Sequence, residues 1–296
     1  MHKTVIVKLK GGMGNQMFQY AFSRALIAAA KGRGDTVHVD YDITAYTSNG
    51  RVHADTLRTF DLQKLSCEIP LASERSALSA RTPYGFASNI LRRVLRKFFT
   101  PDIIHYDKRL LTTPYRKYYE GYWQSEKYFK GIEAEIRKHF TFRDPLDPVA
   151  QAMKEKIEND PYAVGIFFRR TDYVGHSDLD VCDEAYYSRA LAKMHELVPN
   201  MHLYVMSDDI EWVKQHAKLP EDATYVSSPS ISYIEEMEIS TACKHHIIPN
   251  STFAWWGAWL STNHDKIIIA PKLWSKSYND TNFKDIIPES KNWLRI

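Results

Sequence analysis

Two runs of short apolar segments, each alternating with helical patterns, constrain the fold of this chain more than any other feature. In the first run, the apolar stretch Val5–Leu9 leads through a glycine-rich loop into a helical pattern over Gln16–Ala30. A second apolar stretch, Thr36–Val39, follows. Strands joined by helices are parallel, because the helix carries the chain back to the starting edge of the sheet. The first run therefore predicts a parallel α/β unit.

The second run is longer and follows the proline-containing sequence FRDPLDP at 142–148. Its strand candidates are 162–168, 202–206, 224–226, 246–248 and 266–270. Its helix candidates are 149–158, 184–197, 209–216, 231–242 and 252–260. The run predicts a second α/β domain with ligand sites at the carboxyl ends of its strands. We therefore expect two domains that face a cleft, with the boundary between residues 148 and 149.

Composition excludes several classes of protein. A chain of 296 residues with 44% hydrophobic residues is long enough to bury its own core, so global disorder is excluded. The cysteines are odd in number and widely spaced, which argues against a disulfide framework and favours a reducing compartment: Cys67, Cys182 and Cys243. No apolar stretch reaches membrane-spanning length. We expect a cytoplasmic protein.

Charge is unevenly distributed along the chain. Residues 1–148 hold 24 Lys and Arg against 15 Asp and Glu, and residues 149–296 hold 15 against 21. A basic half suits a nucleic acid, a membrane surface or a phosphorylated substrate. The segment 89–99 (NILRRVLRKFF) is a basic amphipathic helix candidate, which would lie either on a membrane or as a solvated helix face. No basic and aromatic module typical of nucleic-acid binding is present.

The loop GGMGNQMFQY follows the first strand. Gly12 and Gly14 allow the backbone to approach a ligand, and Asn15 and Gln16 offer amide groups at the helix start. This pattern predicts a loop that faces a phosphate or a sugar. A dinucleotide fingerprint would need a glycine where Met17 stands, and no Walker A sequence is present. A tight turn that binds nothing is equally compatible with the loop alone.

The sequence FFRRTDYVG places two arginines at the carboxyl end of a strand. Guanidinium groups match phosphate geometry, so a pyrophosphate is the natural partner of Arg169 or Arg170. Adjacent side chains on a strand face opposite ways. We therefore expect one arginine to face the ligand and the other to pair with Asp172 or another carboxylate. A purely structural role for both arginines is the alternative.

Two further strand ends carry polar residues that either bind a ligand or cap a helix. Ser251 or Thr252 would cap the tryptophan-rich helix of PNSTFAWWGAWL, and a capped helix start attracts anions. Asp208 and Asp209 would bind a ribose or a purine, or would only cap the next helix. Two acidic pairs have the spacing of a metal–diphosphate site, which also occurs often by chance: Asp40 with Asp42, and Asp178 with Asp180.

Aromatic residues concentrate in 115–130, including Tyr115, Tyr118, Tyr122 and Trp123. Rings of this kind stack on sugar faces or fill a core, and we expect most of them to be core.

Taken together, five segments resemble the α-1,2-fucosyltransferase family of inverting glycosyltransferases. They are GGMGNQMFQYAFSRAL, GYWQSEKYF, RRTDYV, MSDDIEWVK and NSTFAWWGAWLS, and they span nearly the whole chain. The resemblance implies an α/β fold of the GT-B type, with two Rossmann-like domains. It implies transfer of L-fucose from GDP-β-L-fucose to a hydroxyl, expected to be O2 of a terminal β-galactoside in a surface glycan. It also implies no metal and no other cofactor.

The resemblance further implies roles for domains and residues. Residues 149–296 would bind the GDP-sugar and residues 1–148 the oligosaccharide or lipid-linked glycan acceptor. Arg169 would contact the pyrophosphate, and Asn15 would lie at the reaction centre. Independently of the resemblance, a carboxylate would deprotonate the acceptor hydroxyl: Asp172 in the motif, or Asp178 or Asp180 just beyond it, of which we take Asp172 and Asp178 as catalytic candidates. Substrate-binding residues would be Gly12, Gly14, Gln16, Arg170, Asp208, Asp209, Asn250, Ser251, Thr252 and Phe253.

The arginine motif departs from the family at two positions. Phe167 stands where the family has a histidine that contacts the base in some relatives, and Thr171 stands where it has glycine. At this position the chain instead resembles the α-1,6 relatives, which have threonine there. Transfer of another GDP-linked sugar, or a different linkage, is therefore the main alternative. A non-catalytic GDP- or glycan-binding protein and an NAD-dependent oxidoreductase are weaker alternatives.

Overall fold

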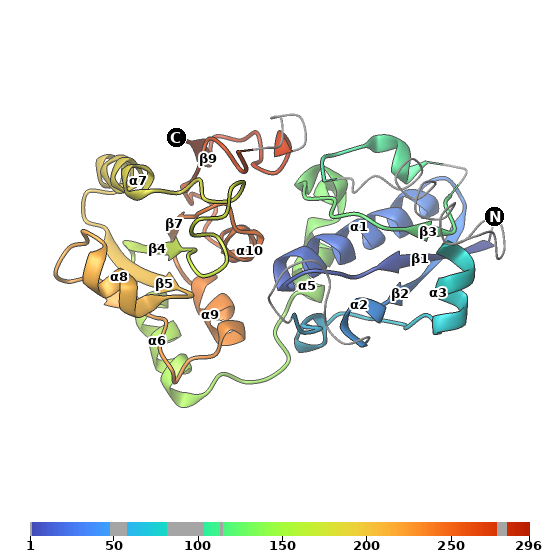
Figure 1. The fold of residues 1–296 in the computed structure, drawn as a ribbon, viewed down its shortest axis with the longest axis horizontal. Helices are drawn as coiled ribbons and strands as arrows, with labels where there is room; N and C mark the ends of the chain where they lie inside the picture. Colours follow the sequence, from blue (N-terminus) through green and yellow to red (C-terminus); the bar gives the residue numbers. More distant parts are fainter. Residues whose placement is uncertain (1, 48–57, 82–103, 113–114, 277–282) are drawn as a thin grey trace. The chain divides into compact units, whose positions relative to one another are not determined.

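The computed structural model describes residues 2–47, 58–81, 104–112, 115–276 and 283–296 (Figure 1). They form two compact units: unit 1 comprises residues 1–143 with 284–286, and unit 2 comprises 144–283 with 287–296. The boundary at 143/144 precedes the expected one at 148/149, because Pro148 already opens a helix of unit 2. The basic helix expected at 89–99 lies outside the described residues.

Unit 1 is built on a parallel sheet with the order β2-β1-β3 among its described residues. The strands are β1 (His2–Lys8), β2 (Thr36–Asp42) and β3 (Tyr118–Tyr119). The α-helices are α1 (Met13–Lys31), α2 (Thr44–Thr47), α3 (Glu74–Arg81) and α5 (Glu133–His139). Short 3₁₀ helices are η1 (Leu62–Lys64), η2 (Lys108–Leu111), η3 (Glu126–Tyr128) and η4 (Lys130–Ile132).

Helix α1 forms the core of unit 1 with the sheet. Met17, Phe18 and Phe22 on this helix are fully buried, as are Val5 and Val7 on β1. In Figure 1, α1 runs beside β1 and β2. The strand–loop–helix–strand order expected from the sequence is confirmed, and it holds the glycine-rich loop at the carboxyl end of β1.

Unit 2 contains a longer parallel sheet in which strands and helices alternate. The strands are β4 (Ala163–Phe168), β5 (His202–Ser207), β6 (Thr224–Tyr225), β7 (His245–Ile247), β8 (Ile268–Ala270) and β9 (Trp293–Arg295). The helices are α6 (Pro148–Glu158), α7 (Glu184–Leu197), α8 (Ile210–His216), α9 (Tyr233–Ser240) and α10 (Thr252–Leu260).

The strand order in unit 2 is β6-β5-β4-β7-β8-β9, with every pairing parallel. Renumbered from β4, this is 3-2-1-4-5-6, the order of a doubly wound nucleotide-binding sheet. The order reverses between β4 and β7, and ligands of such sheets bind outside the carboxyl ends of the strands at that point. The sequence places FRRTD after β4 and NST after β7, so both motifs lie at this switch point.

Helices cover both faces of this sheet, and strand β4 shows why. Val164, Ile166 and Phe168 lie in the hydrophobic cluster that includes helices α7 and α8. Phe167 faces the other way, toward α10, where a Cβ on Gly257 would lie 3.7 Å from its ring. That Cβ would also lie 2.3 Å from Ser240 Oγ, so only glycine lets α10 pack this closely on α9. Because β4 is buried on both faces, it contains only apolar residues and glycine.

Two short strands were not predicted from the sequence. The expectation that 266–270 is the last strand is wrong, because β9 pairs with β8 near the end of the chain. Strand β3 lies in the aromatic segment, which showed no period of its own. Among the described residues, no helix combines the length and apolar character needed to cross a membrane.

Candidate active site

Arg169 leaves the end of β4 and enters a network of carboxylates. Its guanidinium forms ion pairs with Asp172 and, at 2.7 Å, with Asp208 Oδ2. It also lies 5.1 Å from the ring centre of Tyr173. An arginine has five N–H donors, so two ion pairs leave donors for an anion. The network holds Arg169 at the switch point and compensates its charge.

Asp208, at the end of β5, ties the arginine motif together. Its Oδ1 accepts a hydrogen bond from the Arg170 backbone N–H at 2.8 Å, and its Oδ2 accepts one from Thr171 Oγ1 at 2.6 Å. Thr171, which departs from the family pattern, therefore has a defined structural partner. Neighbouring Asp209 accepts from Trp212 N–H at 3.3 Å and caps α8. Of the two roles that the sequence left open, ligand binding and helix capping, the structure assigns capping to Asp209. Asp208 instead holds the arginine motif, a role that the sequence did not predict.

Arg170 turns toward helix α8. Its guanidinium carbon lies 3.2 Å from the ring centre of Trp212, and its Nε lies 3.7 Å from Asp209 Oδ2. We expected Arg170 to bind substrate, but its side chain is stacked on an aromatic ring and directed at the helix cap. The expected division between a ligand-facing and a carboxylate-paired arginine is not seen in the ion pairs, because both Arg169 and Arg170 have carboxylate partners.

Helix α10 begins at the carboxyl end of β7, beside the end of β4. Ser251 is its N-cap, accepting from Ala254 N–H at 3.5 Å, so Ser251 rather than Thr252 is the cap. Partly exposed Phe253 contacts Phe167 edge to face, with ring centres 6.4 Å apart. The backbone N–H groups of the first turn give this end of the helix a partial positive charge.

Asn250 is not available to a substrate in this structure. It is 2% exposed, and its Nδ2 donates to Leu179 O at 2.9 Å and Trp274 O at 3.0 Å. Its own carbonyl oxygen accepts from Tyr173 Oη at 3.3 Å. Asn250 therefore joins the loop after the arginine motif to the start of α10. Its role in substrate binding stays a prediction.

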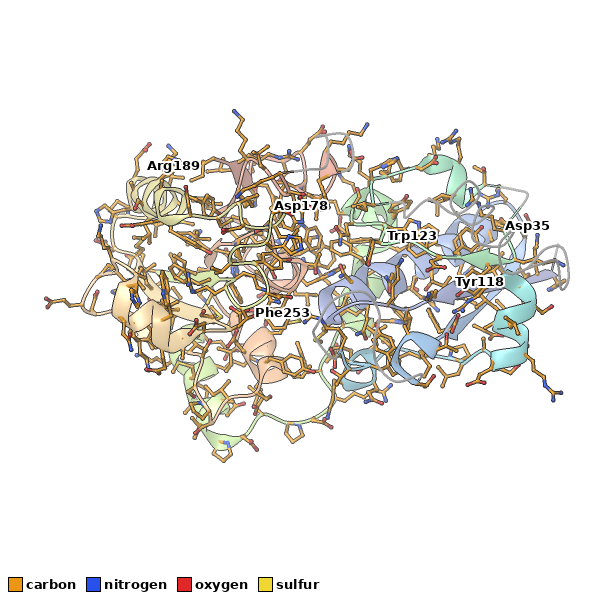
Figure 2. All side chains as sticks on the ribbon, viewed as in Figure 1. Asp35, Tyr118, Trp123, Asp178, Arg189 and Phe253 are labelled. Carbon is orange, nitrogen blue, oxygen red and sulfur yellow. The ribbon has the colours of Figure 1, made fainter. Side chains whose placement is uncertain are left out.

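Asp178 lies on that loop and is partly exposed. Its Oδ1 accepts from Ser177 Oγ at 3.2 Å, and its backbone oxygen accepts from Lys276 N–H at 2.8 Å. Figure 2 shows Asp178 and Phe253 well separated from Arg189, which is exposed on α7. Asp172, in contrast, is the counter-ion of Arg169. Of the two carboxylates expected to act in catalysis, Asp178 is the one without an arginine partner among the described residues.

In unit 1, the glycine-rich loop holds Asn15 at the start of α1. Gly11 has a φ of +81°, and a Cβ there would lie 2.7 Å from Asn15 Nδ2. Gly12 is the N-cap residue of α1, and Gly14 is buried in the first turn of the helix. Position 11 of this turn therefore requires glycine.

Gln16 has a structural role. It is fully buried, and its Nε2 donates to Gly11 O at 3.1 Å and Thr59 O at 2.8 Å. Its Oε1 accepts from the backbone N–H groups of Asp61 and Leu62. All the hydrogen-bonding capacity of its amide is used. The expectation that Gln16 contacts substrate is not met in this structure.

Charged groups near the carboxyl ends of β1 and β3 are paired. Glu120 Oε1 lies 2.9 Å from Lys8 Nζ and 3.6 Å from Lys10 Nζ. Asp42 accepts from Tyr118 Oη at 2.5 Å and pairs with Arg81, so its carboxylate belongs to an internal network rather than to an Asp40–Asp42 metal site.

Most of the aromatic cluster is core, as expected. The side chains of Tyr115, Tyr118 and Trp123 are at most 8% exposed. Tyr122 is partly exposed, with Lys10 Nζ 4.6 Å from its ring centre.

One carboxyl group near this site was missed in the sequence. Glu236, on α9, accepts a hydrogen bond from Ser227 Oγ, which in turn accepts from Ser207 N–H at 2.8 Å. Burial, with the nearby charge of Asp208, raises the pKa of Glu236 to about 7. A single glutamate in the helical sequence YIEEMEIS gives no signal that it turns inward, because two more glutamates stand beside it.

Comparison with known proteins establishes the family. The family model described as glycosyl transferase family 11 matches residues 4–296. The chain belongs to glycosyl transferase family 11. It is 29% identical to an alpha-1,2-colitosyltransferase of Escherichia coli, covering 99% of this chain and 98% of that protein. It is 26% identical to a galactoside 2-alpha-L-fucosyltransferase of Caenorhabditis elegans, covering 89% of this chain and 70% of that protein.

Another relative of this family 11 chain is the O-antigen biosynthesis glycosyltransferase WbnK of Escherichia coli, at 26% identity over 92% of this chain and 95% of that protein. Among solved structures, the fucosyltransferase NodZ from Bradyrhizobium superposes with a TM-score of 0.51 at 14% identity, covering 88% of this chain and 94% of that one. The protein is therefore a family 11 glycosyltransferase with an α/β fold of the GT-B type, as the sequence resemblance implied.

Proposed function

We propose that this glycosyltransferase moves L-fucose from GDP-β-L-fucose to O2 of a terminal β-galactoside, with inversion at the anomeric carbon. The observation that carries the proposal is the Arg169 network at the switch point of a nucleotide-binding sheet. The family match over residues 4–296 and the likeness to a galactoside 2-alpha-L-fucosyltransferase support the choice of sugar and linkage.

Unit 2 binds the donor diphosphate in this proposal. Arg169 and the first turn of α10 carry positive charge at the ends of neighbouring strands β4 and β7. They stabilise the negative charge that grows on the diphosphate as it leaves. Because the protein supplies this charge, the proposed reaction needs no divalent metal.

The bond changes are those of a single displacement. The acceptor oxygen forms a bond to the anomeric carbon, and the bond from that carbon to the diphosphate oxygen breaks, its electron pair leaving with GDP. The proton of the acceptor hydroxyl passes to a carboxylate, and Asp178 is our candidate. Asn15, in unit 1, is proposed to contact the reacting sugars.

A second candidate donor sugar is colitose, favoured by the 29% identity to an alpha-1,2-colitosyltransferase. Colitose is fucose without the 3-hydroxyl. A site that hydrogen-bonds this hydroxyl rejects the deoxy sugar strongly, whereas a site with an apolar wall discriminates weakly. The ratio of kcat/KM for the two donors therefore distinguishes the candidates.

The proposal is tested by measuring GDP release from GDP-fucose and from GDP-colitose in EDTA, with lactose or N-acetyllactosamine as acceptor. We expect acceptor-dependent release, with a 2-linked product by NMR. Replacing Arg169 with alanine should lower kcat/KM by about 10²–10³-fold. Arg189→Ala, at the exposed arginine of α7 (Figure 2), is the matched control and should leave activity unchanged. Failure to turn over either donor, in a protein that does not bind GDP, contradicts the proposal.

A further inference from the structure

The turn after β3 in unit 1 is strained. Trp123 has a φ of +47°, and it is the one non-glycine residue with positive φ in the part of the chain that the structure describes. A bulky side chain in this region of backbone conformation is strained, and such residues cluster at functional sites. The Trp123 ring is 1% exposed and stacks on Phe22 at 4.1 Å between ring centres, so the ring itself belongs to the core.

The strained turn fixes the residue that follows it. Gln124 N–H donates to Ile104 O at 2.7 Å, and Ser125 N–H donates back to Trp123 O at 2.8 Å. These two bonds fix the backbone that carries the Gln124 side chain. It is 7% exposed, which is unusual burial for a glutamine.

The Gln124 amide is only half satisfied. Its Nε2 donates to Asn15 Oδ1 at 2.7 Å. Its Oε1 is buried and has no hydrogen-bond partner among the described residues. An unpaired buried acceptor is destabilising, and native proteins avoid one unless a ligand or water uses it. The contrast with Gln16 and Gln19 is direct, because both amide groups of each are bonded within the protein.

Asn15 is held by the same contact. Its Oδ1 accepts from Gln124, and its Nδ2 lies against Gly11, where no side chain fits. Gln124 therefore sets the direction of the Asn15 amide. Together the two side chains offer one carbonyl acceptor and one amide donor, which is the set that a sugar hydroxyl requires, since it both donates and accepts.

We propose that Gln124 is a substrate-binding residue: its Oε1 accepts a hydrogen bond from a sugar hydroxyl, while its Nε2 orients the Asn15 amide toward the same sugar. The inference rests on the proposed transferase function and deepens it. The hydroxyl belongs to either the donor sugar or the acceptor sugar, and the experiment separates these sources.

The experiment uses the full chain with Gln124→Leu, which removes both amide groups, and Gln124→Glu, which keeps the acceptor and loses the donor to Asn15. Gln151→Leu, at an exposed glutamine of α6, is the matched control. For each variant, kcat, both KM values, acceptor-independent hydrolysis of the donor and Tm are measured with the donor that the wild-type protein uses. We expect kcat/KM to fall about 10–100-fold in both Gln124 variants and to stay unchanged in the control.

Deoxy sugars provide a readout that a structural role would not move. The wild type should discriminate against one monodeoxy acceptor, or against GDP-colitose relative to GDP-fucose, and Gln124→Leu should lose that discrimination. An acceptor-side contact leaves hydrolysis of the donor unchanged, whereas a donor-side contact lowers it in parallel.

Unchanged kcat/KM in folded Gln124→Glu, or deoxy-sugar preferences that persist in Gln124→Leu, would overturn the proposal. Wild-type protein without transferase activity would instead reject the proposed function itself.

Discussion

The strand edges of the two units carry different polar groups. At the switch point of unit 2, Arg169 lies among carboxylates. In unit 1, the loop after β1 and the turn after β3 present the neutral amides of Asn15 and Gln124, and the cations Lys8 and Lys10 are paired with Glu120. Charged groups suit a phosphate, and oriented amides suit uncharged hydroxyls. The difference teaches that the fold alone does not determine what binds at the edge of a parallel sheet. A few side chains at the strand ends determine the ligand.

The largest expected effect follows from a substitution at the charged strand edge of unit 2. Asp208→Asn removes the carboxylate that bonds Arg169, Arg170 and Thr171. The arginine motif then loses its anchor, and we expect kcat/KM to fall about 100-fold. Asp209→Asn, one residue away, is the control. It changes the cap of α8 and the distant ion pair with Arg170, and it should cost less than about 1 kcal/mol of stability, with little loss of activity. Equal losses in the two variants would contradict the separate roles of these aspartates.

The neutral edge is tested at Gly11. Gly11→Ala forces a positive φ on alanine and places its Cβ 2.7 Å from Asn15 Nδ2. We expect a loss of about 1–3 kcal/mol in unfolding free energy and at least a tenfold fall in kcat. Gly34→Ala is a matched control in the same unit, because Gly34 has a φ of +77° but no atom within 4 Å of its Cβ position. The control should lose stability alone, and a similar loss of kcat would mean that the contact with Asn15 is irrelevant.

Measuring stability over a pH series tests how Glu236 in unit 2 ionises. The pKa of Glu236 is about 7 in the folded protein, above its ordinary value of 4.5. The raised pKa therefore contributes stability that is complete below pH 4.5 and is lost as the pH rises through 7. Glu236→Gln keeps a neutral side chain at every pH, so its stability relative to wild type should improve by roughly 2 kcal/mol between pH 5 and 8. Denaturant titrations at several pH values measure this, and a constant difference would show that Glu236 ionises normally.

The smallest expected effect concerns helix α10. Ser251→Ala removes its N-cap and should cost about 1 kcal/mol of stability, together with a modest rise in the KM for the donor. Ser232→Ala removes the cap of α9, so it should cost similar stability and leave KM unchanged. Identical KM values in the two variants would exclude α10 from donor binding.

The sequence predicted the parallel α/β architecture well, because most strands and helices differ in period and several are bounded by capping residues. Helices α7, α8 and α10 occupy their expected residues closely. Strands β3 and β9 contain too few residues to show a period, and their pairing depends on contacts across the fold.

The candidate site was harder to predict, since its decisive contacts join distant residues. That Arg169 and Asp208 would follow neighbouring strands was foreseeable, but that Asp208 would bond Arg169 while Asp209 caps a helix was not. Asn250 and Gln16 lie in the motifs that predict the site, yet their amide groups donate hydrogen bonds to backbone carbonyl groups of the protein itself. Gln124 stands in the segment GYWQSEKYF, but nothing in that segment singled it out, because its burial depends on the strained turn at Trp123.

Residues 284–286 give unit 1 a piece of chain that is synthesised after most of unit 2. Asp285 is 6% exposed, lies 2.5 Å from Lys127 Nζ and accepts from the Tyr106 backbone N–H. The ribosome has then already made nearly all of unit 2, so the unit that is begun first cannot be completed first. Cutting the gene at the unit boundary would produce an N-terminal fragment without its last segment and a C-terminal fragment with an unpartnered aspartate.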